Sequence, residues 1–354
     1  MSDFDFELPP HLIAQQPCPD RSGSRLLKVD RTLQTFLPGR FSDLPECLRP
    51  GDLLVLNNSR VIPARLRAQK MGGGGRIEVF LLHPATNGGW WTLVRPGKRV
   101  RPGTVLAFDC SNPNEATTQA VILEKRDDGQ CRVDFGPETD VLAFSERHGE
   151  IPLPPYIRRE SPRAEDRNRY QTVYARHSGS VAAPTAGLHF TLDLLEDIRN
   201  QGVQIAEVTL HVGIGTFAPV KVDDPAEHVM HAEHYEVPLA TADAIRRVKA
   251  LGNRVVAVGT TSLRVLESVA RTHHGQIEAG KGTTHLFLYP PATFQIVDAL
   301  LTNFHLPRST LLMLVSAFAA PGLVTGRDLI LAAYREAVKQ EFRFFSYGDA
   351  MWIA

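Results

Sequence analysis

The chain has 354 residues, which is enough for two domains of ordinary size. Hydrophobic residues make up 43% of it and charged residues 22%, a composition that suits a globular protein with a core and excludes a disordered chain. The 39 Lys and Arg residues balance 39 Asp and Glu residues, so a chain that is basic throughout is excluded, although a local basic patch for nucleic acid is not.

The cysteines and the apolar segments indicate a cytoplasmic protein. The four cysteines are scattered without a C-x-x-C pair, so we expect neither a disulfide framework nor a structural zinc site. The first residues are acidic and lack the apolar centre of a signal peptide. The longest apolar run, Leu311–Ala320, is too short to span a bilayer, so no membrane contact is expected.

Residues 1–66 are predicted to form the first part of an α/β domain, starting with a helix near Pro9 and Pro10. The continuous apolar run Leu53–Leu56 is typical of a strand that is buried on both faces. Three polar residues follow it, and such residues at the carboxyl end of a parallel strand often face a ligand: Asn57, Asn58 and Arg60. An asparagine-rich turn without a ligand is the alternative.

Residues 67–152 have a different pattern, in which short strand-like segments alternate with Gly- and Pro-rich turns. The strand candidates are Arg76–Leu82, Trp90–Val94, Val105–Phe108, Ala120–Glu124 and Cys131–Phe135. No helix-length period appears in this region, so no helix is expected there. The pattern therefore predicts a small all-β barrel or sandwich that interrupts the α/β domain.

One turn of this insert is strongly basic. It carries Lys98, Arg99 and Arg101 and contains no acidic residue, so it could contact a phosphate backbone. A strand edge protected by solvated positive charges is the alternative.

The linker that returns from the insert is proline-rich and then rich in arginine. Arg158, Arg159 and Arg167 precede Tyr170, and arginines mixed with tyrosines suit phosphate contacts and base stacking on RNA. Ion pairs on a helix surface explain the same residues as an alternative.

Residues 153–354 are predicted to form the second part of the α/β domain. The irregular stretch Gly179–Thr191 contains Thr185, Gly187 and His189, and its small residues let a backbone approach a ligand closely. Thr191 is expected to cap a helix, so the stretch leads into a helix N-terminus. An ordered connector whose glycines only permit tight turns is the alternative.

Further strand ends in this part also carry glycine or polar residues. Strands are expected over Val203–Val212, Arg254–Val258 and Leu286–Tyr289, and the polar or glycine positions near strand ends are His211, Gly213, Gly215, Thr260, Thr261, Asn303 and His305. The repeated strand–loop–helix order predicts a mostly parallel sheet covered by helices. The carboxyl edge of such a sheet usually forms a ligand crevice. No G-x-G-x-x-G or Walker A motif occurs, so nothing supports NAD or ATP.

Histidines at 228, 231 and 234 invite a metal-site interpretation. The set matches no familiar metal enzyme, and we expect no metal. Acid–base chemistry by His231 and Glu233 is the other functional interpretation. For the isolated histidines of the strand ends, a structural hydrogen-bonding role is the alternative.

Eight ordered segments of the chain resemble the S-adenosylmethionine:tRNA ribosyltransferase-isomerases, an enzyme family of the queuosine pathway. They run nearly the full length, at 56–65, 170–174, 179–191, 211–217, 228–235, 259–264, 302–307 and 344–351. The chain departs from the family after residue 289, where Pro-Pro-Ala-Thr-Phe stands in place of a usual Pro-Gly-Tyr, and at Ser59, where threonine is common.

The resemblance implies an α/β domain interrupted by a β-barrel, and a reaction with two substrates. The ribosyl group of S-adenosylmethionine is transferred to 7-aminomethyl-7-deazaguanine at the wobble position of a tRNA and isomerised, giving epoxyqueuosine with release of adenine and methionine. S-adenosylmethionine is consumed as a substrate, and neither a further cofactor nor an assembly beyond the monomer is implied.

That reaction needs a base near C5′ of the sulfonium substrate and an acid for the departing adenine. The acid–base candidates are His189, His211, His231, Glu233 and His305. The substrate carboxylate needs an arginine or helix amides. The substrate-binding candidates are Asn57, Asn58, Arg60, Thr185, Gly187, Gly213, Gly215, Thr260, Thr261, Arg264 and Asn303. A tRNA-binding module without chemistry and a metal-dependent nucleoside hydrolase are the rival hypotheses.

Overall fold

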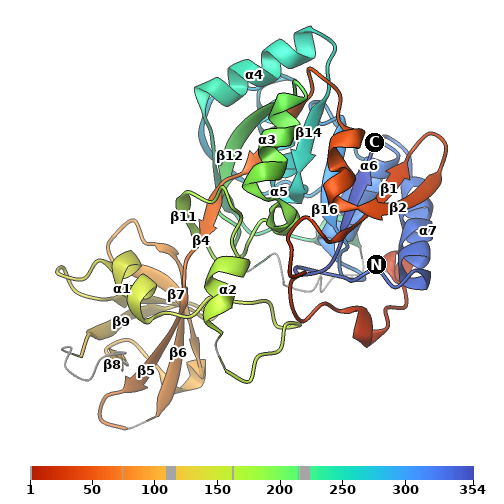
Figure 1. The fold of residues 1–354 in the computed structure, drawn as a ribbon. Coiled ribbons are helices and arrows are strands. Elements are labelled where there is room, and N and C mark those ends of the chain that lie inside the picture. Colours follow the sequence, from red (N-terminus) through yellow and green to blue (C-terminus); the bar gives the residue numbers. More distant parts are fainter. Residues whose placement is uncertain (1, 74, 109–116, 162, 214, 216–223) are drawn as a thin grey trace.

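The chain forms a nine-stranded sheet and a separate six-stranded closed barrel in the computed structural model (Figure 1). The structure describes residues 2–73, 75–108, 117–161, 163–213, 215 and 224–354. Cys110 and, from the segment 211–217, Ile214, Thr216 and Phe217 lie outside the described residues. The expected combination of a helix-covered sheet with a small inserted barrel is thus confirmed.

The large sheet is parallel at its centre and mixed at its flanks. Its strands, in spatial order, are β15 (Gly280–Thr284), β13 (Glu233–Val237), β12 (Gln204–Leu210), β3 (Leu53–Asn57), β14 (Val255–Val258), β16 (Ala299–Asn303), β17 (Ala350–Ile353), β1 (Arg25–Asp30) and β2 (Thr35–Arg40). The four central strands, β12, β3, β14 and β16, are parallel to one another. Their carboxyl ends therefore meet at one edge.

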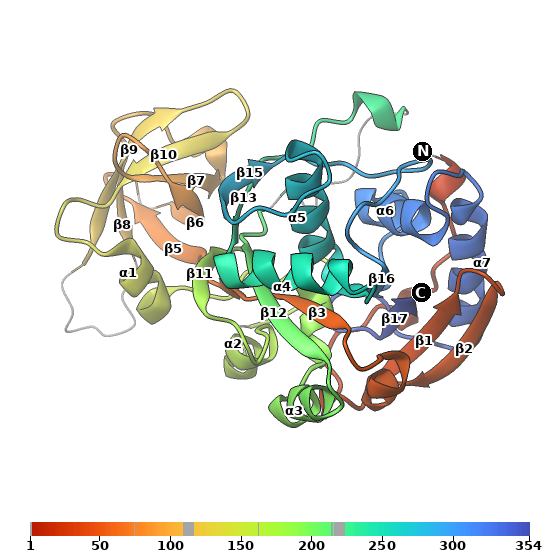
Figure 2. The same ribbon diagram turned by 90° about the horizontal axis from the view of Figure 1, so that it is seen from above.

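Helices cover both faces of this sheet (Figure 2). Alternate residues of β3 point to opposite faces, because successive side chains of a strand alternate. Leu53 and Val55 pack in the core of one face, and Leu54 and Leu56 in the core of the other. The first face is covered by α4 (Leu239–Ala250), α5 (Gly259–Thr272), α6 (Thr310–Ala319) and α7 (Gly326–Lys339). The second is covered by α3 (Leu192–Asn200) and a 3₁₀ segment, Phe41–Cys47.

The barrel is antiparallel throughout. It consists of β5 (Arg65–Lys70), β6 (Arg76–Pro84), β7 (Trp90–Arg95), β8 (Val105–Phe108), β9 (Gln119–Lys125) and β10 (Gln130–Asp134). The expectation of no helix in this region is wrong, because α1 (Val141–His148) follows the barrel. Asp140 caps this helix, and Phe144 packs edge-on against Phe108 in the barrel core. With only 8 residues, α1 is too short for its sequence to reveal a helical period.

The barrel is joined to the sheet by two chain segments that run side by side. On the outward path lies β4 (Ser59–Val61), and on the return lies β11 (His177–Ser180), which pairs with it in parallel. The return linker also contains the short helix α2 (Ala164–Arg169).

Two local predictions are wrong. The helix expected near Pro9 is a single 3₁₀ turn, Pro10–Leu12, because the chain then leaves to pair with Phe344. The segment Leu286–Tyr289 lies outside the sheet, and the residues just before it form β15 instead. In both cases pairing with a segment remote in the chain determines the local structure, and the residues of the segment alone do not reveal that pairing.

Candidate active site

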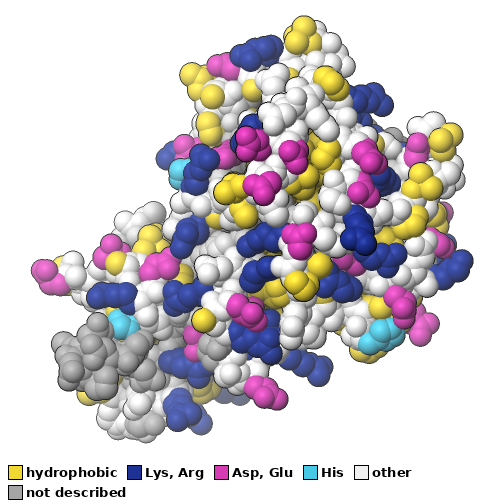
Figure 3. Space-filling model, viewed as in Figure 1, with side chains coloured by type: hydrophobic (Ala, Val, Ile, Leu, Met, Phe, Trp, Pro, Cys, Tyr) yellow, Lys and Arg dark blue, Asp and Glu magenta, His cyan; other side chains and the backbone are white. Residues whose placement is uncertain are grey.

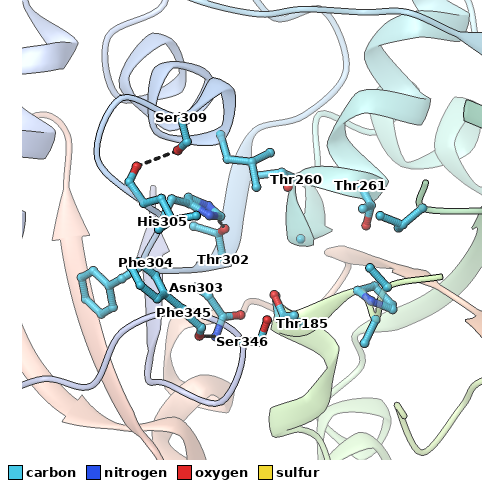
Figure 4. Close-up of a pocket in the computed structure, with 18 of the residues that line it drawn as sticks. Thr185, Thr260, Thr261, Thr302, Asn303, Phe304, His305, Ser309, Phe345 and Ser346 are labelled. Atoms are coloured by element: carbon cyan, nitrogen blue, oxygen red, sulfur yellow. Dashed lines mark hydrogen bonds between the residues drawn. The ribbon is translucent and has the colours of Figure 1, made fainter. Parts of the chain in front are cut away.

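A cavity lies at the carboxyl edge of the parallel strands (Figure 4). Its lining comes from the linker, the stretch after β11, the ends of β12, β14 and β16, and the segment before β17: Tyr156, Ala182–Ala186, Val212, Gly259–Thr261, Thr302–Leu306, Ser309, Leu311, Phe345 and Ser346. Of the predicted site residues, five line it directly: Thr185, Thr260, Thr261, Asn303 and His305. The crevice expected at this edge of the sheet is therefore present.

Two helices begin at this cavity. Gly259 opens α5 with a φ of +83°, a conformation that favours glycine, and places Thr260 and Thr261 in the first turn. Ser309 caps α6, since its Oγ accepts from the Leu312 amide at 3.2 Å. First-turn amides have no partner inside a helix, and the helix dipole is positive at that end. The cavity is therefore suited to an anionic group.

The Asn303 side chain joins the cavity to the protein interior. Its Nδ2 donates to the Phe345 carbonyl oxygen at 3.1 Å and to His189 Nε2 at 3.2 Å. Its Oδ1 is buried without a hydrogen-bond partner among the described residues, as is Thr261 Oγ1. Since a buried polar atom without a partner costs free energy, these two oxygens are places where a ligand gains binding energy.

His305 is a neutral imidazole in the cavity wall. Its Nε2 lies 2.9 Å from Thr302 Oγ1, and its backbone amide donates to the Tyr334 hydroxyl at 2.8 Å. Burial lowers the pKa of His305 to about 3, because the charged form would lose its hydration. At neutral pH the ring can donate and accept hydrogen bonds without carrying charge.

His189 is held inside the protein and does not line the cavity. Its Nε2 accepts from Asn303, and its Nδ1 lies 2.7 Å from Ser24 Oγ, so the network assigns the ring proton to Nδ1. The ring stacks on Phe41 with 4.9 Å between ring centres. Burial lowers the pKa of His189 to about 4. Both nitrogens are occupied, so the structural role weighed for this histidine fits its surroundings better than proton transfer.

Glu233 and Arg264 form a buried ion pair beside the cavity. Both side chains are 5% exposed, and Arg264 Nη1 donates to Glu233 Oε2. Glu233 Oε1 also accepts from the Gly213 amide at 3.2 Å. Arg264 Nη2 is buried with no partner among the described residues. Thr260, one helical turn before Arg264, lines the cavity, whereas Arg264 and Glu233 themselves are not among its lining residues.

The two asparagines after β3 bind the protein's own chain. Asn57 exchanges hydrogen bonds with the backbone of Leu210, and Asn58 bonds the side chains of Thr209 and Glu207. These bonds fasten β3 to β12. Both side chains are buried, so a ligand role would require these bonds to break.

The remaining candidates for catalysis or substrate binding lie away from the cavity lining. His211 lies 2.9 Å from Ser59 Oγ at the junction with the barrel, and burial lowers its pKa. His231 is exposed and covers Gly215, where a Cβ would lie 2.3 Å from the imidazole. Arg60 is exposed and pairs with Glu146 at 3.8 Å.

Gly187 stands next to the cavity-lining stretch for a packing reason. A Cβ at Gly187 would lie 2.1 Å from the Tyr174 hydroxyl oxygen, so only glycine fits there. Packing therefore requires a glycine at this position, which is not itself among the residues that line the cavity.

The predicted RNA-contact residues fall into two classes. The first class is exposed: Lys98, Arg99 and Arg101 on the barrel, and Arg158 on the linker. The second is bonded to the protein's own chain or buried, although Arg167 in this class is also 41% exposed. Arg159 forms a two-bond ion pair with Asp166, and Arg167 donates to the carbonyl oxygens of Glu146 and Gly149. Tyr170 is fully buried, so its ring cannot stack on a base in this structure.

Sequence reasoning missed Tyr156, Phe345 and Ser346 as cavity residues. The Tyr156 hydroxyl lies 2.7 Å from Ser346 Oγ, and its ring packs on Phe345. Burial raises the pKa of Tyr156 to about 12. For Tyr156 the only sequence signal was an aromatic residue directly after a proline-rich run, which does not indicate where the linker docks, whereas Phe345 and Ser346 lie in the family-like segment 344–351.

Neither a metal-binding cluster nor a membrane-spanning helix occurs within the described residues. No group of three or more His, Cys, Asp or Glu side chains is arranged to hold a metal ion there. In the same part of the chain, every helix is too short or too polar to cross a membrane.

Comparison with known proteins places the chain in a family. The profile of a family described as "Queuosine biosynthesis protein" matches residues 1–353. The chain is 50% identical to the S-adenosylmethionine:tRNA ribosyltransferase-isomerase of Natranaerobius thermophilus and 52% identical to that of Thermotoga maritima, covering 100% of this chain and 99% of each relative. A crystal structure of S-adenosylmethionine tRNA ribosyltransferase from Thermotoga maritima covers 100% of both chains at 43% identity, with a TM-score of 0.55. The chain therefore belongs to the queuosine biosynthesis protein family.

Proposed function

We propose that this chain transfers the ribosyl group of S-adenosylmethionine to 7-aminomethyl-7-deazaguanine in tRNA and isomerises it, releasing adenine and methionine. The observation that carries the proposal is the full-length similarity, at 50% and 52% identity, to proteins named for this activity. The cavity supports it, because two helix N-termini and several hydroxyl groups meet there at one sheet edge.

S-adenosylmethionine is proposed to bind with its carboxylate at the start of α5. The amides of that turn and the positive end of the helix dipole favour an anion. Asn303 Oδ1 and Thr261 Oγ1 then gain the partners that they lack, from the substrate's ammonium group or its ribose hydroxyls.

His305 is proposed to hold the substrate by hydrogen bonds and not to remove a proton. A pKa of about 3 makes its neutral ring a weak base. His305→Gln keeps a hydrogen-bonding side chain, so it should lower kcat by less than about 10-fold, whereas losing a general base typically costs about 100- to 10,000-fold. Adenine release at saturating substrate measures kcat, and a loss beyond about 100-fold would assign proton transfer to His305.

Arg264 is proposed to contribute to substrate binding through Nη2, which has no partner among the described residues. Arg264→Lys keeps the charge for Glu233 but removes this donor, so the KM for S-adenosylmethionine should rise about 10-fold, the worth of one hydrogen bond to a charged group. Arg246→Lys on α4, an exposed arginine, is the matched control. An unchanged KM in a folded Arg264→Lys variant would remove Arg264 from the binding site.

The activity itself is tested by incubating the protein with S-adenosylmethionine and tRNA that carries the aminomethyl base. We expect adenine release and the mass increase of epoxyqueuosine in the tRNA. RNA binding without adenine release would favour the tRNA-binding module. Loss of activity on chelation would favour the metal-dependent hydrolase, because we infer that the protein works without a metal. We also infer that it is a monomer in the cytoplasm.

A further inference from the structure

A groove runs along the linker and shares one lining residue with the active-site cavity. This linker groove is lined by residues of the N-terminal segment and of the linker, among them Gln15, Gln16, Tyr156, Arg158, Ser161 and Arg163. Tyr156 also lines the cavity, so this residue borders both hollows.

Tyr156 presents an aromatic ring at this junction. One side of the ring packs on Phe345, with 4.8 Å between ring centres, and the hydroxyl is held 2.7 Å from Ser346 Oγ. The Gln15 side-chain amide fixes the backbone that directly follows the ring: Nε2 donates to the Tyr156 carbonyl oxygen, and Oε1 accepts from the Arg158 amide, both at 2.9 Å. The ring is therefore held in place between groove and cavity.

The exposed charge of the groove is positive on balance, because Arg158 and Arg163 outnumber the one exposed acid of its lining, Glu160. Within the described part of the chain, the Arg158 guanidinium has no ion-pair partner. Arg163 has only a solvent-exposed contact with Glu165 at 3.5 Å, which is worth little energy. Figure 3 shows Lys and Arg side chains gathered over the linker and α2, between the barrel and the sheet.

Arg159, in the same segment, is bonded within the protein. Its ion pair with Asp166 is nearly buried, and Asp166 also accepts from the Tyr347 hydroxyl at 2.9 Å. Tyr347 directly follows Ser346 of the cavity wall. These bonds tie the linker to the wall, so the groove and the cavity keep their relative position.

We propose that the linker groove carries the anticodon loop of the tRNA and that Tyr156 is the surface on which the wobble base stacks as it reaches the cavity. The inference rests on the proposed function and adds the path of the RNA to it. An enzyme that modifies a base must take it out of the stack, and proteins hold such bases on aromatic rings while arginines contact the phosphates.

The stacking role is tested with Tyr156→Ala and Tyr156→Phe. The probe is an anticodon stem–loop RNA that carries 7-aminomethyl-7-deazaguanine. Tyr156→Ala should weaken its binding about 5- to 100-fold, whereas Tyr156→Phe, which keeps the ring, should stay within about 3-fold of the wild type. Because Tyr156 also lines the cavity, S-adenosylmethionine binding is measured without RNA in both variants, and Tyr156→Ala should weaken RNA binding by a larger factor than S-adenosylmethionine binding. A loss of S-adenosylmethionine affinity with unchanged RNA affinity would assign Tyr156 to the other substrate and overturn the proposal.

The path of the RNA is tested by charge reversal. The double variant Arg158→Glu/Arg163→Glu should weaken RNA binding about 10-fold or more and make its salt dependence shallower. Arg335→Glu, an exposed arginine on α7, is the matched control and should change neither. If Lys98→Glu/Arg99→Glu on the barrel abolishes binding while the linker variant binds normally, the RNA lies elsewhere and the proposal fails.

These measurements separate the two proposals. If the wild-type protein releases no adenine, only the proposed reaction is wrong. The binding assays still test whether the RNA lies in the groove. Normal wild-type turnover with normal RNA binding by all linker variants would instead overturn the groove alone.

Discussion

His189 is a buried imidazole whose two ring nitrogens are both bonded, and this has a consequence for stability at low pH. The pKa of His189 is about 4 in the folded protein, whereas an unfolded chain gives histidine about 6.5. Below pH 6.5 the unfolded state therefore binds a proton that the folded state does not take up. Folding stability contributed by this residue is complete above pH 6.5 and is lost as the pH falls toward 4.

We predict that the free energy of unfolding falls between pH 7.5 and pH 5, and that His189→Gln removes about 2 kcal/mol of this fall. Urea unfolding at the two pH values measures both quantities. The variant is expected to be less stable at pH 7.5, because the bonds to Ser24 and Asn303 change. An identical pH dependence in the variant and the wild type would show that His189 is not the titrating group.

At the residue scale, the sequence could name the polar residues of the site but could not rank them. His189 and His305 both follow glycine or polar residues near strand ends, and the sequence treats them alike. What separates them is the set of bonds around each ring, and Ser24 and Phe41 contact His189 from segments remote in the chain. Tyr156 was missed for the same reason, since only the fold brings the linker to the cavity.

At the scale of elements, α5 carries the cavity at its start and is fastened by a buried carboxylate further along. Glu267 is fully buried, and its oxygens accept from the backbone amides of Gln295, Ile296 and Val297 at 2.9–3.1 Å. Arg271 lies 3.7 Å from the same group. Glu267 thus connects α5 to the segment that leads into β16.

We predict that Glu267→Gln lowers the free energy of unfolding by about 2 to 3 kcal/mol, because an amide nitrogen would face backbone donors in the interior. Glu278→Gln, at an exposed glutamate, is the control and should change stability by less than about 0.5 kcal/mol. Urea unfolding measures both, and adenine release per folded molecule should stay near the wild-type value. A neutral Glu267→Gln would show that the segment is held by other contacts.

Elements with a strong local signal were predictable. The apolar run of β3 and the cap of α3, where Thr191 Oγ1 accepts from the Leu194 amide at 3.1 Å, both occur as expected. Strands without such a signal were not. In β15 the sequence is Gly-Lys-Gly-Thr-Thr, and it is a strand only because β13 supplies its hydrogen bonds.

At the scale of the whole molecule, the barrel interrupts the sheet at a point where the chain nearly closes on itself. Arg65 and Glu150 pair as neighbours, with hydrogen bonds in both directions at 2.9 and 3.2 Å. The two main cores of the sheet contain no residue of β5 to β10. The inserted arrangement was predictable from the change of pattern at the boundaries, whereas the way in which the linker folds back over the sheet was not.

We therefore predict that residues 66–149 can be replaced by a short turn without unfolding the sheet. The shortened protein should bind S-adenosylmethionine with unchanged affinity, since no barrel strand lines the cavity. Its affinity for tRNA should fall if the basic barrel turn contacts RNA. Circular dichroism and equilibrium dialysis measure folding and binding, and an unfolded product would show that the sheet needs the barrel.

The position of β17 has a consequence for how a new molecule is made. Every other strand precedes β17 in the chain, yet it lies inside the sheet, between β16 and β1. During synthesis the barrel can form early. In contrast, β1 and β2 cannot pair with the rest of the sheet until β17, which lies between β1 and β16, has been synthesised. A ribosome that stalls before residue 350 thus releases a chain with two open strand edges, which chaperones and proteases can recognise, and not a nearly finished enzyme.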